Sequence, residues 1–269
     1  MPSTRFSSPF AVGLGLFLCL SVLTADVSFG QAQPAPSRKR FLQWAYQDIG
    51  AWGASIDRQR VLQSVGVVAI LIPISFLDED ISERAANWNE GPFIDFLDGA
   101  NTLGEPIVLL FPASIFALSL FTDNAKFQDA AFTGIQAPLY ANFLTFFSKG
   151  LFGRARPEDG KGAHDFDPFK FADAAFPSGH ATTAFAFLTT WVFYYPSVVT
   201  YSLLIVAVGT AIARLQRQKH WMTDIMAGSV NGTAMAYFLS RLHQGKRSNL
   251  SLNPAIGPGS VGLTMRIGF

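Results

Sequence analysis

Apolar residues gather in six segments of this 269-residue chain. The segments cover about residues 61–76, 107–121, 128–147, 181–195, 197–213 and 225–241. Several carry no charge and are apolar on all sides, which is typical of buried or membrane helices. Runs that alternate apolar and polar residues are few in the core of the chain. The pattern therefore predicts an all-α fold, a helical bundle of about six apolar helices.

Segment length and charge bear on whether these helices span a membrane. Most segments are about 15–17 residues long, somewhat shorter than the ~20 needed to cross a bilayer. The stretch from Leu77 to Pro106 holds eight acidic residues and one basic residue, whereas the regions before residue 61 and after residue 240 are basic. Basic flanks tend to stay inside, which favours spanning with the acidic stretch outside. A membrane-embedded bundle and a very apolar periplasmic domain both stay open.

Both ends of the chain differ from the predicted helical domain, residues 58–243. A basic residue followed by an apolar stretch predicts an export signal over residues 1–30, cleaved near Gly30, with an uncleaved anchor as the alternative. Residues 31–57 combine prolines with a basic run and are predicted to form a linker and an amphipathic collar. Residues 244–269 form a polar tail that ends in an alternating segment, a short β-strand or else a flexible end. A cleaved signal would reverse the orientation of six spans, which leaves the side of the membrane open.

Composition narrows the kinds of ligand. A formal net charge of +1 gives no general attraction to nucleic acid, so an anion must bind through a local group of cations. The single cysteine, Cys19, lies in the predicted signal. The rest of the chain therefore has no thiols for a disulfide or a thiolate metal site.

Three short polar clusters interrupt the apolar segments, and each contains a cation or a donor suited to an oxyanion. Their residues are Lys149, Arg156 and Pro157; Pro177, Ser178, Gly179 and His180; and Arg214, His220 and Asp224. Charged groups in an apolar chain cost stability unless they pair or bind a ligand. The clusters thus indicate a shared anion site.

The first cluster contributes two cations. Lys149 and Arg156 are seven residues apart, so they are predicted to project from one face of a helix that Pro157 ends. An anion between them would relieve their repulsion. The alternative is that both side chains snorkel to a membrane interface.

The second cluster is predicted to begin a helix. Ser178 suits the N-cap position, which places Gly179 and His180 in the first turn. The free backbone N–H groups of such a turn bind anions, and Gly179 lets a ligand approach the backbone closely. An ordinary capped turn with an exposed histidine is the alternative.

The third cluster pairs an imidazole with a carboxylate. His220 and Asp224 are four residues apart and are predicted to be neighbours on a helix face. A carboxylate on one ring nitrogen leaves the other nitrogen as a directed nucleophile. Arg214 adds a planar fork for phosphate oxygens, and a plain surface ion pair is the alternative.

Metal binding and other roles are less well supported by the residues. Besides His180 and His220 the chain has only His164 and His243, and a site rich in cations disfavours a metal ion. We therefore expect no metal and no cofactor. A serine hydrolase based on Ser178 lacks the usual G-x-S-x-G elbow. Arg154, Arg217 and Lys219 add positive charge, and no role is assigned to them.

The order and spacing of the three clusters resemble the signature of the type 2 phosphatidic acid phosphatase and vanadium haloperoxidase superfamily. The matching parts are K-x6-R-P at Lys149 to Pro157, P-S-G-H at Pro177 to His180, and R-x5-H-x3-D at Arg214 to Asp224. The resemblance covers roughly residues 60–241. Ala213 stands where the family usually has serine, which removes one hydroxyl donor to the phosphate.

The resemblance implies a helical bundle and a metal-independent phosphatase. His220 would attack phosphorus to form a phosphohistidine, Asp224 would orient it, and His180 would protonate the leaving alcohol. The equatorial oxygens would be stabilised by Lys149, Arg156, Ser178, Gly179 and Arg214. The apolar helices favour a lipid phosphate or diphosphate as substrate, in a bacterial cell envelope with the site facing the periplasm. The alternatives are a soluble nonspecific acid phosphatase in the periplasm, a vanadate-dependent haloperoxidase, a lipid phosphotransferase and a non-catalytic envelope protein.

Overall fold

The structure is a computed structural model that describes seven stretches of the chain. They are residues 37–55, 69–88, 91–102, 110–171, 173–245, 250–257 and 260–267. The predicted export signal lies outside the described residues, and the predicted collar and tail are described only in part.

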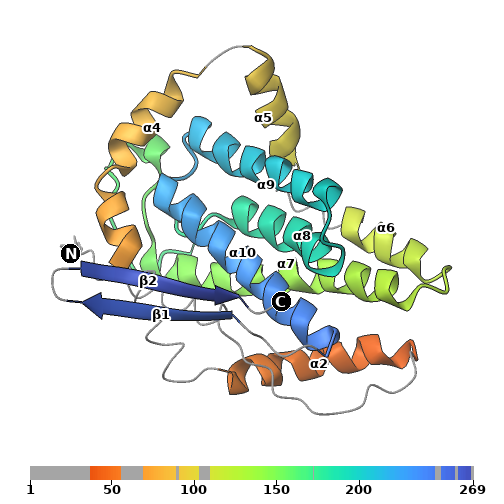
Figure 1. Cartoon of the computed structure of the whole chain (residues 1–269). Helices are drawn as coiled ribbons and strands as arrows, with labels where there is room; N and C mark the ends of the chain where they lie inside the picture. The colour runs from red at the N-terminus through yellow and green to blue at the C-terminus, as the bar shows by residue number, and fades with distance from the viewer. Residues whose placement is uncertain are drawn as a thin grey trace.

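Helices make up the body of the molecule (Figure 1). They are α2 (Lys39–Ala54), α4 (Asp78–Ala86), α5 (Pro92–Thr102), α6 (Leu110–Ser119), α7 (Ala125–Phe152), the short 3-10 helix η2 (Pro157–Asp159), α8 (Gly179–Tyr194), α9 (Val198–Gln216) and α10 (Met222–His243). Residues 69–75 are also helical. The predicted all-α bundle is confirmed, and the apolar segments at 128–147, 181–195, 197–213 and 225–241 lie mainly in α7 to α10.

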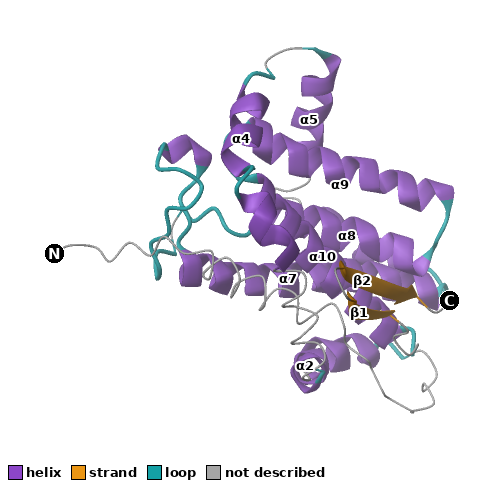
Figure 2. Cartoon of the chain, turned by 60° about the vertical axis from the view of Figure 1, so that its left-hand side comes forward, coloured by secondary structure: helices purple, strands orange, loops and turns teal. Residues whose placement is uncertain are grey.

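Helices α7, α8, α9 and α10 lie side by side and form the core of the bundle (Figures 1 and 2). The closest approach is between α8 and α10, because α10 presents Gly228 and Gly232 to it. A Cβ at Gly228 would lie 2.4 Å from the carbonyl oxygen of Ser178, and one at Gly232 would lie 2.3 Å from that of Thr182. Only glycine at both positions allows the two backbones to pack this closely.

Helix α2 lies on the outside of the bundle beside α7 and α10 (Figure 1). Its buried Asp48 accepts hydrogen bonds from Gln136 Nε2 at 2.7 Å and from His243 Nε2 at 2.9 Å. The ring of Trp44 stacks on that of His243 at 3.8 Å between centroids. Polar contacts and stacking therefore fix α2, and its opposite face leaves Leu42 and other apolar side chains exposed.

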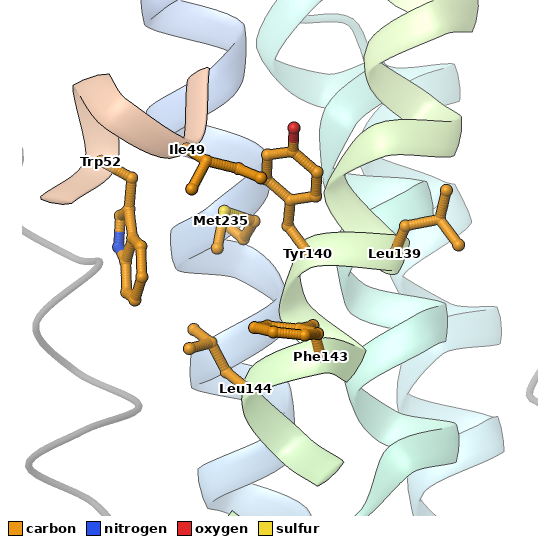
Figure 3. Close-up of a pocket in the computed structure, with 7 residues that line it drawn as sticks. All are labelled: Ile49, Trp52, Leu139, Tyr140, Phe143, Leu144 and Met235. Atoms are coloured by element: carbon orange, nitrogen blue, oxygen red, sulfur yellow. The ribbon is translucent and has the colours of Figure 1, made fainter. Parts of the chain in front are cut away.

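An apolar cavity of about 280 Å³ lies between α2, α7 and α10. Ile49 and Trp52 of α2, Leu139, Tyr140, Phe143 and Leu144 of α7, and Met235 of α10 line it (Figure 3). The Tyr140 hydroxyl donates to the carbonyl of Ala45 at 2.7 Å, so even this polar group is directed to the α2 backbone.

The acidic stretch from Leu77 to Pro106, predicted as a loop, contains helices α4 and α5. Three acids fill the first turn of α4, where they stabilise the helix dipole. One of them, Asp78, is fully buried rather than exposed. Of the helices described, α9 alone has the length and apolar character of a membrane span.

The tail contains two antiparallel strands, β1 (Leu250–Gly257) and β2 (Ser260–Ile267). Their register pairs Leu250 with Ile267 and Gly257 with Ser260. The alternating segment predicted as a short strand lies in β2.

Candidate active site

The second polar cluster begins α8, as the sequence predicts. The Ser178 Oγ accepts from the backbone N–H of Ala181 at 3.4 Å, and Gly179 and His180 are the first helical residues. The backbone N–H of Ser178 donates to the carbonyl of Asp224 at 3.0 Å. This bond ties the start of α8 to the first turn of α10, so the second and third clusters lie against each other.

The first cluster differs from the prediction, because Lys149 and Arg156 do not share a helix. Helix α7 ends at Phe152, and Gly153 adopts the left-handed conformation with φ of 56°. Arg156 lies beyond this turn in extended backbone. The glycine supplies the positive φ that turns the chain back, and this turn replaces the predicted second helical turn.

Lys149 and Arg156 nevertheless face the same space. Burial lowers the pKa of Lys149 to about 8, and the charges of Arg156 and Arg214 act in the same direction. The Lys149 ammonium donates to the carbonyl of Ala174. The Arg156 Nε is buried and has no hydrogen-bond partner among the described residues. A donor left in this way suits an oxyanion.

His220 also departs from the predicted geometry. Helix α10 begins at Met222, so His220 precedes the helix instead of lying on its face. The Nδ1 atom lies 2.7 Å from the carbonyl oxygen of Ala175 but 3.8 Å from Asp224 Oδ2. The longer distance is not a hydrogen bond. A backbone carbonyl, which only accepts, therefore fixes the proton on Nδ1 and leaves the Nε2 lone pair free to react.

Asp224 is held by other partners. Its Oδ2 accepts from the backbone N–H of Trp221 at 2.8 Å, and its Oδ1 accepts from Arg154 Nη1 at 2.5 Å. Burial favours the neutral acid, but Arg154, His220 and the backbone N–H of Trp221 together outweigh it and hold the pKa of Asp224 below its usual value. The carboxylate thus stays charged beside His220 and acts on it through space.

The three clusters converge, because Lys149 bonds to the carbonyl of Ala174, His220 to that of Ala175, and Ser178 to that of Asp224. Burial lowers the pKa of His180 to about 3, with further lowering by Arg214, His220, Lys149 and Arg156. Burial likewise lowers the pKa of His220 to about 4, and two of these cations act in the same direction. Both histidines are therefore neutral at pH 7 and lie near the cations Lys149, Arg156 and Arg214; these five side chains together are called the cup. A bound anion would counter the charge of these cations.

Arg214 completes the cup from the last turn of α9. Its Nη1 donates to Asn101 Oδ1 on α5 at 3.2 Å, which orients the guanidinium. Ala213, at the position where the resemblance implies serine, is fully buried. It contributes no hydroxyl to the cup.

Sequence reasoning missed two charged residues and one backbone group. Arg154 and Asp78 are fully buried and form an ion pair at 2.8 Å between Nη2 and Oδ2. In the sequence, Arg154 lies between Lys149 and Arg156, and this position could have drawn attention to it. No sequence pattern marks the distant Asp78 or the carbonyl of Ala175. Among the described residues no group of three or more histidine, cysteine or acidic side chains could hold a metal ion.

Comparison with known proteins finds similarity to one superfamily and to two phosphatases. Residues 132–248 match the model of the PAP2 superfamily. A lipid A 1-phosphatase from Rhizobium johnstonii is 32% identical over 108 residues, which are 38% of this chain and 41% of the relative. A lipid A 1-phosphatase from Rhizobium etli is 28% identical over 184 residues, 62% of this chain and 78% of the relative. The first match thus spans less than half the length of that relative.

A solved structure is also similar. It is the first transmembrane PAP2 type phosphatidylglycerolphosphate phosphatase from Bacillus subtilis, with 19% identity and a TM-score of 0.48 over 64% of this chain and 87% of that chain. The stretch that matches the PAP2 superfamily model, residues 132–248, holds all three polar clusters in order, so this part of the chain is similar to that superfamily.

Proposed function

We propose that this chain is a metal-independent phosphatase that hydrolyses a phosphate monoester or diphosphate of a lipid through a phosphohistidine. The observation that carries the proposal is the cup itself. It joins a neutral imidazole with a fixed tautomer to three cations, Lys149, Arg156 and Arg214. Phosphoryl transfer needs mainly positioning and the stabilisation of spread negative charge, and these cations supply that charge.

In the first step, His220 Nε2 attacks phosphorus while the bond to the ester oxygen breaks. The phosphoryl group is surrounded by His180, the first residues of α8 and the three cations. His180 gives its proton to the leaving oxygen. The phosphate dianion brings the negative charge that lets His180 hold this proton despite its low pKa in the ligand-free protein. In the second step, water attacks phosphorus, His180 takes the water proton, and phosphate leaves His220.

The surface around the cup supports a lipid substrate. Phe143, Phe146 and Phe147 are exposed on α7 just before Lys149, and Phe171 of the following loop packs on Phe146 at 5.5 Å between ring centroids. Exposed aromatic side chains beside a polar site are typical of proteins that meet a lipid surface. The Rhizobium relatives are lipid A 1-phosphatases, so the 1-phosphate of lipid A is the first substrate to test.

Phosphate release by the full chain in detergent tests this function. The substrates are lipid A, phosphatidic acid and a soluble phenyl phosphate, each with the wild type and the His220→Ala variant. His164→Ala is the matched control, because its ring contacts Ser75 and Phe76 rather than the cup. We expect His220→Ala to abolish phosphate release and His164→Ala to retain it. Undiminished release by His220→Ala would refute the assignment.

The covalent intermediate has a test of its own. Brief reaction with a radiolabelled substrate, followed by quenching at high pH, should leave acid-labile label on the wild type. His220→Ala should carry no label. His180→Ala should lose label slowly, because it lacks the base for the second step. Label of equal amount on wild type and His220→Ala would exclude His220 as nucleophile.

We also propose that the protein is associated with the membrane of a bacterial envelope and that the cup faces the periplasm. The predicted export signal and the exposed apolar faces of α2 and α7 support this location. Carbonate extraction of membranes and protease access to residues 158–176 from the periplasmic side test it. Cleavage of this loop from the cytoplasmic side alone would contradict the proposed orientation.

A further inference from the structure

Arg154 is fully buried behind the cup, and every nitrogen of its guanidinium has a partner. Nη1 donates to Asp224 Oδ1 at 2.5 Å and to Thr223 Oγ1 at 2.8 Å. Nη2 donates to Asp78 Oδ2 at 2.8 Å, and Nε donates to the carbonyl of Ala163 at 2.8 Å. With no exposed surface, the guanidinium cannot reach a substrate in the cup.

The backbone of the same residue reaches the other side of the nucleophile. The Arg154 carbonyl accepts from the N–H of Ala175 at 2.8 Å, and the Ala175 carbonyl accepts from His220 Nδ1 at 2.7 Å. Two groups face the Nδ1 side of the imidazole, the Ala175 carbonyl and the Asp224 carboxylate. Arg154 bonds to both of these residues, to the backbone N–H of Ala175 through its own carbonyl and to the Asp224 carboxylate through its guanidinium.

We propose that Arg154 is the positioning residue of the nucleophile: it holds the Ala175 carbonyl on His220 Nδ1 and keeps the Asp224 carboxylate turned away from the cup. This role deepens the phosphatase function proposed above and rests on it. Arg154 does not touch phosphate. It acts through Ala175 and Asp224, and its effect is that Nε2, and not Nδ1, faces phosphorus.

Charge explains why the carboxylate needs this partner. Asp224 is fully buried, and removing one member of a buried ion pair is strongly destabilising because it leaves an uncompensated charge. Without Arg154, the carboxylate could pair with Lys149, whose pKa Asp224 already raises. A carboxylate turned toward Lys149 would occupy a phosphate-binding cation. Arg154 thus keeps the negative charge out of the anion site.

Asp78 supports the arrangement from the far side. Its Oδ1 accepts from the backbone N–H of Thr223 at 3.0 Å, and its Oδ2 accepts from the Thr223 hydroxyl at 2.5 Å. It therefore fixes the guanidinium and the first turn of α10 without contacting His220. The two ion pairs of Arg154 can be broken separately, which separates a positioning role from a merely structural one.

The test compares four variants of the full chain in detergent. Arg154→Met removes both pairs, Arg154→Lys keeps the charge without the fork, and Asp78→Asn weakens only the outer pair. Arg217→Met is the control, because Arg217 forms an exposed ion pair with Asp98 at 2.7 Å. Three quantities are measured: the thermal midpoint, kcat and KM with a soluble phosphate ester, and the His220 tautomer by ¹⁵N NMR, assigned with His220→Ala.

We expect Arg154→Met to lower kcat on the order of 10²-fold, the cost of a misplaced reacting group, with a much smaller change in KM. Arg154→Lys should recover part of the loss, and it also serves if Arg154→Met fails to fold. Both Arg154 variants keep the backbone carbonyl that bonds to Ala175, but they lose the guanidinium contacts that anchor the backbone of residue 154 and, through it, the Ala175 carbonyl. The NMR spectrum should therefore show the proton on Nδ1 in wild type and Asp78→Asn, and a mixture of tautomers in the Arg154 variants. Asp78→Asn should lose stability with little loss of kcat.

Two results would overturn the role of Arg154. One is a wild-type tautomer in both Arg154 variants. The other is a loss of kcat in Asp78→Asn as large as that in Arg154→Met at equal thermal stability. The NMR readout needs no turnover, so it decides the positioning role even if no substrate is hydrolysed. Absence of phosphate release by the wild type would instead refute the phosphatase function.

Discussion

Gly153 offers a sharp test of how the turn after α7 builds the site. An alanine Cβ at this position would lie 1.7 Å from the carbonyl oxygen of Asp167, so the backbone on one side must move. The left-handed conformation itself costs a non-glycine residue about 1–2 kcal/mol. Gly160 has a similar φ of 63°, yet a Cβ there would have no neighbour within 4 Å. Alanine at Gly160 therefore measures the conformational cost without the clash.

The clash should add about 1–3 kcal/mol, the usual cost of overpacking, to the loss in Gly153→Ala. For a domain of this size the extra loss lowers the thermal midpoint by roughly 2–12 °C relative to Gly160→Ala. Thermal unfolding of both variants in the same detergent measures the difference. Because Arg154 is the next residue, kcat should also fall in Gly153→Ala and not in Gly160→Ala. Equal midpoints and equal kcat in the two variants would refute this account of the turn.

Three further predictions concern stability. Gly232→Ala should separate α8 from α10 at a cost of about 1–3 kcal/mol in thermal unfolding, and an unchanged midpoint would contradict the close packing. The pKa values of His180 and His220, about 3 and 4, lie below the unfolded value near 6.5. The unfolded state therefore binds more protons than the folded state between about pH 6.5 and 4. The thermal midpoint should fall as the pH is lowered through this window, and it should fall less with added phosphate. A midpoint that rises as the pH is lowered would contradict this prediction. Asp48→Ala removes hydrogen bonds to a buried carboxylate, including that of His243, worth about 1.5–3 kcal/mol each. Limited proteolysis should then cleave within residues 37–55 faster than in wild type while kcat is kept, and equal cleavage rates would mean that this contact does not hold α2.

Local chemistry made much of the site predictable. Ser178 is an N-cap by its side chain and its place before an apolar run, and the structure places it there. The long apolar segments form helices because each carries helix-forming residues and must bury its surface. Spacing within a cluster was less reliable. The seven-residue spacing of Lys149 and Arg156 in the sequence suggested a shared helix. However, Gly153 lies between them, and its positive φ ends α7.

Contacts between distant segments could not be predicted from the sequence. The partner of His220 Nδ1 is the carbonyl of Ala175, and a backbone carbonyl is identical in every residue. Asp78 lies in a stretch whose many acids suggested an exposed loop, yet its carboxylate is buried against Arg154. Such a pairing depends on tertiary packing, which a single sequence does not show. The sequence paired His220 with Asp224, whereas the structure places the carbonyl of Ala175 closer to Nδ1, at 2.7 Å, than Asp224 Oδ2, at 3.8 Å.

The close packing of α8 against α10 couples the geometry of the site to the stability of the bundle. His180, the proposed acid–base residue, begins α8, and His220, the proposed nucleophile, precedes α10, while Gly228 and Gly232 allow the two helices to pack closely. A bulkier residue at either glycine would widen the gap between the two imidazoles as well as loosen the bundle. A bulkier residue at either position is therefore expected to lower the thermal stability and the turnover number together.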